Sequence, residues 1–152
     1  MSVAPRSFNM LVLYIEDHPN NVLLIQRIVK AEGHSFLHAA DGESGRIALD
    51  NNQPDLIFVD LRLPGQIDGY DLIRHIKTNA RLQNTPTVVL TAYGYGEAEI
   101  TASQAGCDAF LHKPADIREI RTVIRQFLGE PEPAQPVVPA NGRSWAKLPA
   151  SR

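Results

Sequence analysis

Short apolar runs alternate with segments of helical periodicity along most of this chain, and this alternation limits the fold more than any other feature. Four of the runs are almost continuously apolar, as expected of strands buried on both faces of a parallel sheet. The run SFLHA is more polar and is expected at an edge. The sequence therefore predicts five strands, MLVLYI at 10–15, SFLHA at 35–39, DLIFV at 55–59, TVVL at 87–90 and DAFL at 108–111.

The segments between and after these runs predict helices. In the first segment Val22, Ile25 and Val29 recur at helical spacing, and Gly33 is expected to end the helix. In the last segment apolar residues recur every three or four positions from Ile117, and Asp116 is expected to cap the helix. Three further helices are predicted over residues 42–51, 70–78 and 97–105.

A strand followed by a helix, repeated five times, predicts the α/β fold class. The arrangement expected is a flavodoxin-like, doubly wound parallel sheet with strand order 2-1-3-4-5 and helices on both faces. In such sheets the functional site lies beyond the carboxyl ends of the strands, at the switch point between strands 1 and 3. The residues that follow each strand are therefore the informative ones.

Composition separates one folded domain from the two ends of the chain. The chain has 152 residues and a mass of 16.8 kDa, enough for one domain and a short extension. Residues 8–129 are expected to form the domain, and residues 1–7 a flexible N-terminus. Residues 130–152 contain five of the eleven prolines, which fix φ and remove backbone donors, so a disordered Pro-rich tail is expected.

Charge and cysteine content exclude several classes of protein. The formal charge of −2 argues against a nucleic-acid-binding surface. The single cysteine, Cys107, excludes disulfides within the chain and a cysteine-based zinc site. The N-terminal residues lack the apolar run of a signal peptide, and no stretch approaches the ~18 apolar residues of a membrane span. We therefore expect a cytoplasmic protein that binds neither nucleic acid nor membranes.

Acidic, hydroxyl and amino groups follow the predicted strands. Glu16 and Asp17 follow the first strand, Asp60 the third, Thr91 the fourth and Lys113 the fifth. Three carboxylates at one sheet edge repel one another unless a cation lies among them, and hard oxygen ligands suit Mg²⁺. Thr91 and Lys113 could contact a phosphoryl group from the other side. The pattern indicates phosphoryl transfer with a carboxylate as the nucleophile.

With these residues in this order, the chain resembles the receiver domain of response regulators, the phospho-acceptor module of two-component signalling. The resemblance covers about residues 9–129. It rests on the acidic pair Glu16-Asp17, on PDLIFVDLRLP around Asp60, on Thr91-Ala92 and on Lys113-Pro114. Each motif is weak alone, but together, each at the end of its own predicted strand, they form a specific pattern.

The resemblance implies a role for each of these side chains. Asp60 would accept a phosphoryl group from a phosphohistidine on a histidine kinase or a histidine phosphotransfer protein. Lys113 would pair with Asp60 and then with the phosphoryl group. Mg²⁺ would be bound by Asp17, Asp60 and the backbone carbonyl of Arg62, with Glu16 acting through water.

The resemblance also implies a conformational switch. Thr91 would hydrogen-bond the phosphoryl oxygen and move towards it, and the rotamer of Phe110 would follow Thr91. Pro114 would follow a cis peptide bond, whereas the sequence alone supports only a tight turn there. A domain of this kind, with no output domain in its short tail, would change its binding to a downstream protein target. It would be no enzyme beyond Mg²⁺-dependent self-phosphorylation and self-dephosphorylation, and a homodimer is compatible with the sequence.

The chain departs from the family pattern in three places. Glu16 stands where aspartate is commoner, and its longer side chain changes the geometry of the metal site. The Asp68-Gly69 pair comes one residue later than usual, so residues 65–67 are expected to bulge. Phe110 lacks the hydroxyl of a tyrosine and cannot bond a partner through it.

Other functions fit the residues less well. A small Mg²⁺-dependent aspartyl phosphatase would need a second acid where Arg62 stands, and a flavodoxin would need a hydroxyl-rich loop after the first strand, where the acidic pair would repel phosphate. A receiver-like scaffold that takes no phosphate stays open as an alternative. His18 is interpreted as a solvated residue at the start of a helix, because Mg²⁺ prefers oxygen ligands. The sequence identifies neither the kinase nor the target.

Overall fold

The computed structural model of the chain describes residues 9–92 and 96–131. Five strands and five helices alternate along these residues, as the sequence predicts. The strands are β1 (Leu11–Ile15), β2 (Ser35–Ala39), β3 (Leu56–Val59), β4 (Thr87–Thr91) and β5 (Ala109–His112). The helices are α1 (Pro19–Ala31), α2 (Gly42–Asn51), α3 (Gly69–Lys77), α4 (Glu97–Ala105) and α5 (Ile117–Leu128).

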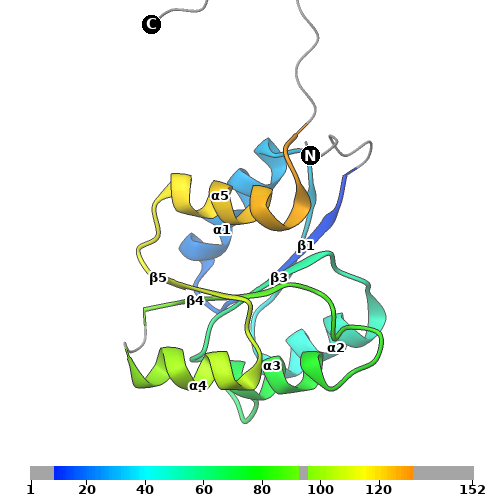
Figure 1. Ribbon diagram of the computed structural model, residues 1–152, viewed down its shortest axis with the longest axis vertical. Helices are drawn as coiled ribbons and strands as arrows, with labels where there is room; N and C mark the ends of the chain where they lie inside the picture. The colour runs from blue at the N-terminus through cyan, green and yellow to red at the C-terminus, as the bar shows by residue number, and fades with distance from the viewer. Residues whose placement is uncertain (1–8, 93–95, 132–152) are drawn as a thin grey trace, which may run out of the picture.

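The strands form one parallel sheet in the order β2-β1-β3-β4-β5. In Figure 1, α1 and α5 cover one face of the sheet, while α2, α3 and α4 cover the other. This is the doubly wound, flavodoxin-like arrangement expected from the sequence. The more polar strand β2 lies at one edge, as predicted, and β5 forms the other edge.

Several strand boundaries differ from the predicted ones by a single residue. Asp55 and Asp108 were predicted inside strands, but each precedes its strand. The carboxylate of Asp55 accepts a hydrogen bond from Leu11 N at 2.8 Å, and that of Asp108 accepts one from Thr87 N at 2.7 Å. Each carboxylate therefore satisfies the first amide of a neighbouring strand instead of extending its own.

The carboxyl ends of two strands also differ from the prediction, and so does the start of the first. Thr91 and His112 were expected to follow strands, but they are the paired last residues of β4 and β5. At the other end of the sheet, Met10 precedes β1, and its N–H donates to Nδ1 of His34 at 3.0 Å. These shifts leave the predicted order of elements unchanged.

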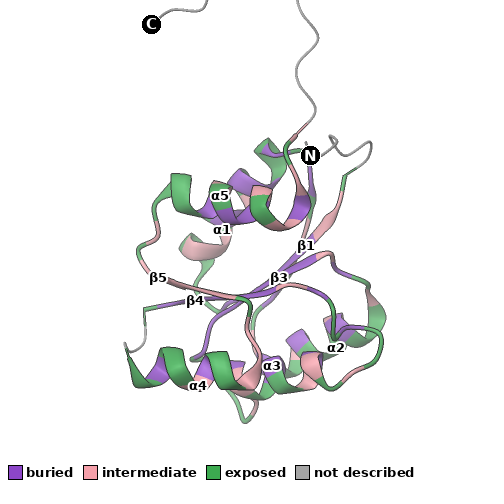
Figure 2. Ribbon diagram, viewed as in Figure 1, coloured by how far each residue is buried: buried purple, intermediate pink, exposed green. Residues whose placement is uncertain are grey.

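Two apolar cores flank the sheet, one on each face, and they appear as the buried segments in Figure 2. Alternate residues of β1 divide between them: Leu13 and Ile15 face α2, α3 and α4, whereas Val12 and Tyr14 face α1 and α5. The four residues of β3 are all fully buried, which explains the continuously apolar run in the sequence.

Aspartates begin three of the helices. Asp41, Asp68 and Asp116 each accept a hydrogen bond from a backbone N–H in the first turn and form a capping box. The prediction that Asp116 caps the last helix is therefore confirmed. Gly33, with φ of 87°, follows the end of α1 as predicted.

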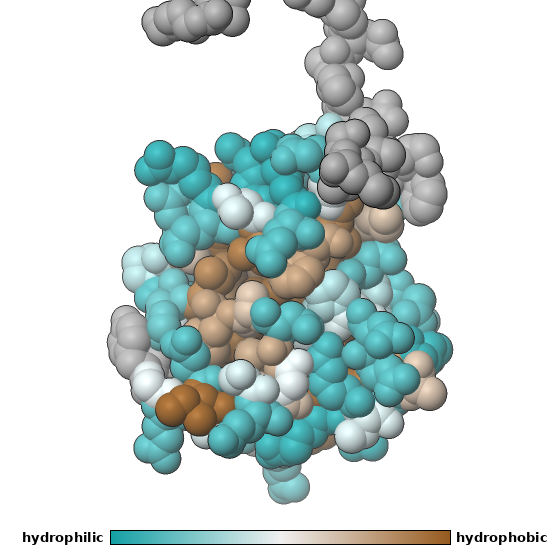
Figure 3. Space-filling view, viewed as in Figure 1, coloured by the Kyte–Doolittle hydropathy of each residue, from teal (hydrophilic) through white to brown (hydrophobic). Residues whose placement is uncertain are grey.

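The edge strand β5 leaves apolar side chains partly exposed. Ala109, Phe110 and Leu111 are half-buried. In the space-filling view, apolar residues gather between α5 and α4, over the sheet edge that β5 forms (Figure 3).

The predictions for the two ends of the chain stay predictions, because residues 1–8 and 132–152 lie outside the described residues. No helix in the described ranges is long and apolar enough to cross a bilayer.

Candidate functional site

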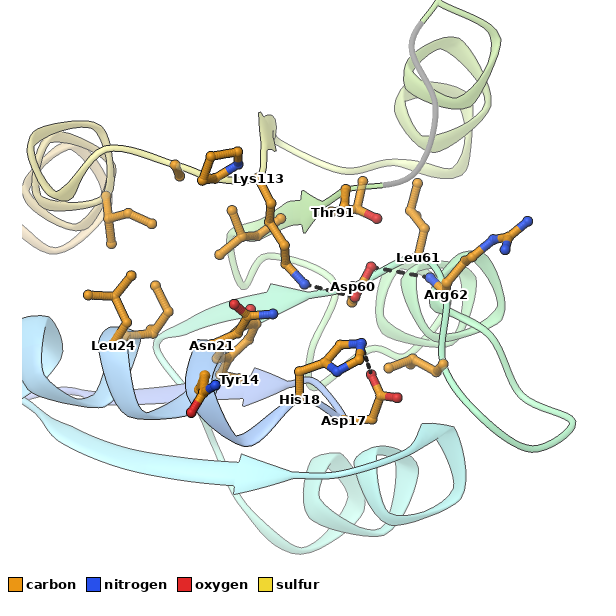
Figure 4. Close-up of a pocket in the computed structure, with 18 of the residues that line it drawn as sticks. Tyr14, Asp17, His18, Asn21, Leu24, Asp60, Leu61, Arg62, Thr91 and Lys113 are labelled. Atoms are coloured by element: carbon orange, nitrogen blue, oxygen red, sulfur yellow. Dashed lines mark hydrogen bonds and ion pairs between the residues drawn. The ribbon is translucent and has the colours of Figure 1, made fainter.

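A pocket of about 1210 Å³ opens at the carboxyl ends of the central strands. Its lining includes five of the residues singled out in the sequence, which are Asp17, Asp60, Arg62, Thr91 and Lys113. Figure 4 shows Lys113 directed towards Asp60, with Thr91 beside the same carboxylate. The parallel sheet therefore brings together residues up to 96 positions apart, from Asp17 to Lys113, at its switch point.

Backbone pairing sets the height of the acidic residues. Ile15 pairs with Val59 in the β1–β3 ladder, and Asp60 N donates to Ile15 O at 3.1 Å. Glu16 and Asp60 therefore leave adjacent strands at the same level. On the other side of β3, Lys113 N donates to Thr91 O at 2.9 Å, which holds the β5 end against the β4 end.

Lys113 is shared between two carboxylates. Its Nζ lies 2.7 and 2.8 Å from the two oxygens of Glu16 and 3.0 Å from Oδ2 of Asp60. The side chains of Lys113, Glu16 and Asp60 are 13%, 0% and 7% exposed. The pairing of Lys113 with Asp60 agrees with the sequence-based expectation. Sequence reasoning missed the closer contact with Glu16.

Burial and the hydrogen bonds around the shared lysine shift the pKa values of Glu16 and Asp60 in opposite directions. Burial raises the pKa of Glu16, and the adjacent Asp60 carboxyl adds to this, while hydrogen bonds from Lys113 and Asn21 oppose it. Burial also acts to raise the pKa of Asp60, but hydrogen bonds involving Glu16, Thr91 and Lys113 outweigh it, so that pKa is lowered. The lowered pKa keeps Asp60 ionised at neutral pH, which is the form a nucleophile requires.

Two more residues hold Glu16, and neither was identified from the sequence. Asn21 Nδ2 donates to Glu16 Oε2 at 3.0 Å, and His38 Nε2 lies 2.7 Å from the backbone oxygen of Glu16. Asn21 lies in the first turn of α1, and His38 lies on β2, next to β1. No local motif marks either contact, because each depends on how two elements pack.

Thr91 and Arg62 contact Asp60 in different ways. Thr91 is fully buried, lies beside the Asp60 carboxylate in Figure 4, and contributes to the lowered pKa of that carboxyl group. Arg62 donates its backbone N–H to Asp60 Oδ1 at 3.3 Å, while its guanidinium extends away from that carboxylate in Figure 4.

Gly69 allows α3 to begin directly beside the acidic residue. A Cβ at this position would overlap the carbonyl oxygen of Asp60 and the Cα of Leu61. Gly69 N also donates to Leu61 O at 3.0 Å. The loop that includes residues 65–67 runs from β3 to this contact without regular secondary structure, where the sequence predicts a bulge.

The donor set fits Mg²⁺. Asp17 is partly exposed towards the pocket, with its side chain 33% exposed, and it faces the same opening as Asp60. Atoms of Glu16, Asp17 and His18 lie within 4.8 Å of one another, so the histidine is close enough to the acidic pair to be considered as a ligand. However, the imidazole is 68% exposed and lies 3.9 Å from Asp17. Hard carboxylate and carbonyl oxygens suit Mg²⁺ better than an imidazole does, which supports the oxygen-only ligand set.

The predicted switch residue Phe110 lies on the edge strand β5, three residues before Lys113. It is half-buried, and its ring centroid lies 5.0 Å from that of His112. In the ladder it pairs with Val89, two residues before Thr91. The peptide bond between Lys113 and Pro114 is cis, as the resemblance implies.

Comparison with known proteins identifies the family. The sequence profile of the response regulator receiver domain matches residues 12–125. This chain belongs to the response regulator receiver family. Among curated relatives, the polar-differentiation response regulator DivK of Brucella anthropi is 26% identical over 119 residues, covering 78% of this chain and 96% of that protein. Response regulator Rre1 of Synechocystis sp. is 33% identical over 118 residues, covering 77% of this chain and 51% of that protein.

Solved receiver structures share the fold. A putative response regulator from Chloroflexus aurantiacus superimposes with a TM-score of 0.74 at 27% identity, covering 80% of this chain and 99% of the other. The receiver domain of the sensor histidine kinase PA1611 from Pseudomonas aeruginosa gives a TM-score of 0.72 at 27% identity, with the same coverage. That structure has a magnesium ion coordinated in its active-site cleft.

Proposed function

We propose that this receiver domain accepts a phosphoryl group on Asp60 from a phosphohistidine of a histidine kinase or histidine phosphotransfer protein. The observation that carries the proposal is the Lys113 ammonium held between Asp60 and Glu16 at the pocket wall, with Thr91 beside the Asp60 carboxylate. An ionised nucleophile, a cation and a hydroxyl donor thus meet at one opening.

The transfer forms one bond to phosphorus and breaks another. An oxygen of the Asp60 carboxylate attacks phosphorus, the bond between phosphorus and the histidine nitrogen breaks, and the imidazole leaves with the electron pair and takes a proton from water. Lys113 Nζ lies 3.0 Å from Asp60 Oδ2, so its positive charge attracts the negatively charged phosphoryl oxygens. Thr91 donates its hydroxyl to one of these oxygens.

Mg²⁺ would be held by Asp17, Asp60 and the backbone carbonyl of Arg62, with Glu16 acting through water. When bound, it neutralises charge on the transferred phosphoryl group. The related receiver structure with magnesium in its active-site cleft supports this assignment. We further propose that phosphorylation changes binding to a downstream protein target in the cytoplasm, with Thr91 and Phe110 as the residues that move.

Incubation with acetyl phosphate and Mg²⁺, followed by the mass of the intact chain, tests the proposal. The native chain should gain one phosphoryl group, and Asp60→Asn or an excess of chelator should abolish the gain. Asp50→Asn, at an exposed position on α2, is the matched control and should gain the group like the native chain. An adduct that persists in Asp60→Asn, or that forms equally with chelator, contradicts the proposal. A native chain that gains nothing would favour the receiver-like scaffold.

A further inference from the structure

Asn21 joins the pocket to the buried acid Glu16. Its side chain lines the pocket, is half-buried, and donates from Nδ2 to Oε2 of Glu16 at 3.0 Å. The carboxylate of Glu16 is fully buried, so it needs hydrogen-bond donors from the protein. Asn21 on α1 and Lys113 after β5 each supply such a donor.

Lys113 alone does not fix the orientation of Glu16. Its ammonium is a compact charge that contacts both oxygens of Glu16, at 2.7 and 2.8 Å, and it is also engaged with Asp60. A glutamate has one more rotatable bond than an aspartate, so its carboxylate can swing about such a contact. A second donor at one oxygen removes this freedom, and Asn21 is placed to do so.

The start of α1 holds Asn21 in place. Pro19 is the first helical residue, and the N–H groups of Asn21 and Val22 both donate to His18 O at 3.1 Å. The amide of Asn21 is therefore attached to a fixed turn that begins two residues after Asp17. This turn therefore connects the side chain that holds the buried Glu16 to the segment that carries the exposed Asp17.

We propose that Asn21 is a positioning residue for the magnesium site. By holding Oε2, it keeps the longer side chain of Glu16 on Lys113, which leaves Asp17 and Asp60 placed to bind the ion. Asn21 acts through Glu16 and touches neither the ion nor the transferred group. This inference rests on the proposed function and names a residue outside the set implied by the family resemblance.

Asn21→Leu tests the inference, because it keeps the approximate volume and removes the donor. Asn20→Leu is the matched control, since Asn20 is exposed, lines the same pocket and has no side-chain hydrogen bond within the described residues. Calorimetric titration of each full chain with Mg²⁺, without phosphodonor, should give roughly tenfold weaker binding for Asn21→Leu and native binding for Asn20→Leu.

Two further readouts separate positioning from a merely structural role. The Mg²⁺ concentration that half-saturates phosphorylation by acetyl phosphate should rise by the same factor in Asn21→Leu, while the rate at saturating Mg²⁺ returns to the native value. In a Glu16→Asp background, where the shorter acid no longer reaches Asn21, the change to leucine should leave the Mg²⁺ affinity unchanged.

Native Mg²⁺ affinity in Asn21→Leu overturns the inference, and so does an equal loss in the Glu16→Asp background or a saturating rate that stays low. If the native chain itself neither binds Mg²⁺ nor takes a phosphoryl group, the proposed function fails and the inference fails with it. If the native chain does both and Asn21→Leu matches it, only the inference fails.

Discussion

At the residue scale, Lys113 places one positive charge between two buried carboxyl groups. Lys113→Met should therefore destabilise the fold by about 3 kcal/mol at neutral pH, because it leaves Glu16 and Asp60 without their counter-charge. The lowered pKa of Asp60 contributes stability above the unfolded pKa of aspartate, and this contribution is lost as pH falls through the folded pKa. The difference between Lys113→Met and the native chain should thus shrink in acid.

Urea unfolding at neutral and acidic pH measures this difference. Lys30→Met is the control, because Lys30 is exposed on α1 and forms no ion pair within the described residues. This change should alter the free energy of unfolding by less than about 0.5 kcal/mol. Equal losses in the two variants would show that the shared lysine does not offset the charge of the buried pair.

Individual side chains could be assigned from the sequence where a strand end fixed their place. Asp60, Thr91 and Lys113 meet because their strands are parallel neighbours, which the alternation of apolar runs already predicts. The contacts of Glu16 with Asn21 and Lys113 could not be predicted, since they depend on the rotamer of a side chain longer than aspartate.

At the scale of elements, an ion pair between a buried glutamate and a partly exposed arginine joins α1 to α5. Glu32, at the end of α1, is 5% exposed, and its oxygens lie 2.7 and 3.1 Å from Nε and an Nη of Arg125. Arg125→Met should therefore lower the free energy of unfolding, because it removes the bidentate contact with the buried Glu32 carboxylate, while the longer contact of Arg121, at 3.7 Å, stays. Arg118→Met, which removes an 87% exposed side chain from the same helix, should lower it by less than about 0.5 kcal/mol. Urea unfolding that gives equal losses would place the Glu32 pair among ordinary surface pairs.

The conformational change on phosphorylation is expected to pass from β4 to β5. Thr91 pairs with His112, and Phe110 pairs with Val89, so movement of the β4 end reaches the edge strand through the ladder. Beryllofluoride with Mg²⁺, which mimics the phosphoryl group, should change amide exchange over residues 91–97 and 108–113. Exchange in β2, on the far side of the sheet, should not change.

Asp60→Asn is the control for this exchange experiment, because it removes the acceptor and should show no response to beryllofluoride. A native chain that binds the mimic without any change in these two segments would contradict the proposed roles of Thr91 and Phe110. Residues 93–95, which include the glycine Gly94, lie outside the described residues. Amide exchange therefore also follows this segment directly.

At the scale of the whole molecule, the domain is expected to fold without its tail. Residues 130–152 contain few apolar side chains, and ordering them costs about 1–2 kcal/mol per residue in backbone entropy. A chain that ends at Gly129 should melt at the same temperature as the full chain. A fall of more than about 4 °C, which corresponds to about 1 kcal/mol, would mean that the tail packs on the domain, with Trp145 and Leu148 as the first candidates.

The topology was accessible from the sequence because every strand but one is an almost continuous apolar run, and helices separate them all. The strand boundaries were less accessible: Asp55 and Asp108 resemble strand residues in the pattern, but their carboxylates satisfy amides of neighbouring strands. A hydrogen bond between a side chain and a distant backbone amide produces no periodic pattern in the sequence. The family resemblance rested on strand ends, which the fold then brought together.

The most direct measurement identifies the residue that carries the phosphoryl group. After incubation with acetyl phosphate and Mg²⁺, reduction with borohydride converts an aspartyl phosphate into homoserine, and fragment masses of the digested chain locate it. We expect homoserine at position 60 alone, in amounts that match the mass gain of the intact chain. Homoserine at Asp17 or at any other aspartate, or a mass gain without homoserine at position 60, would contradict the assignment of Asp60 as the acceptor.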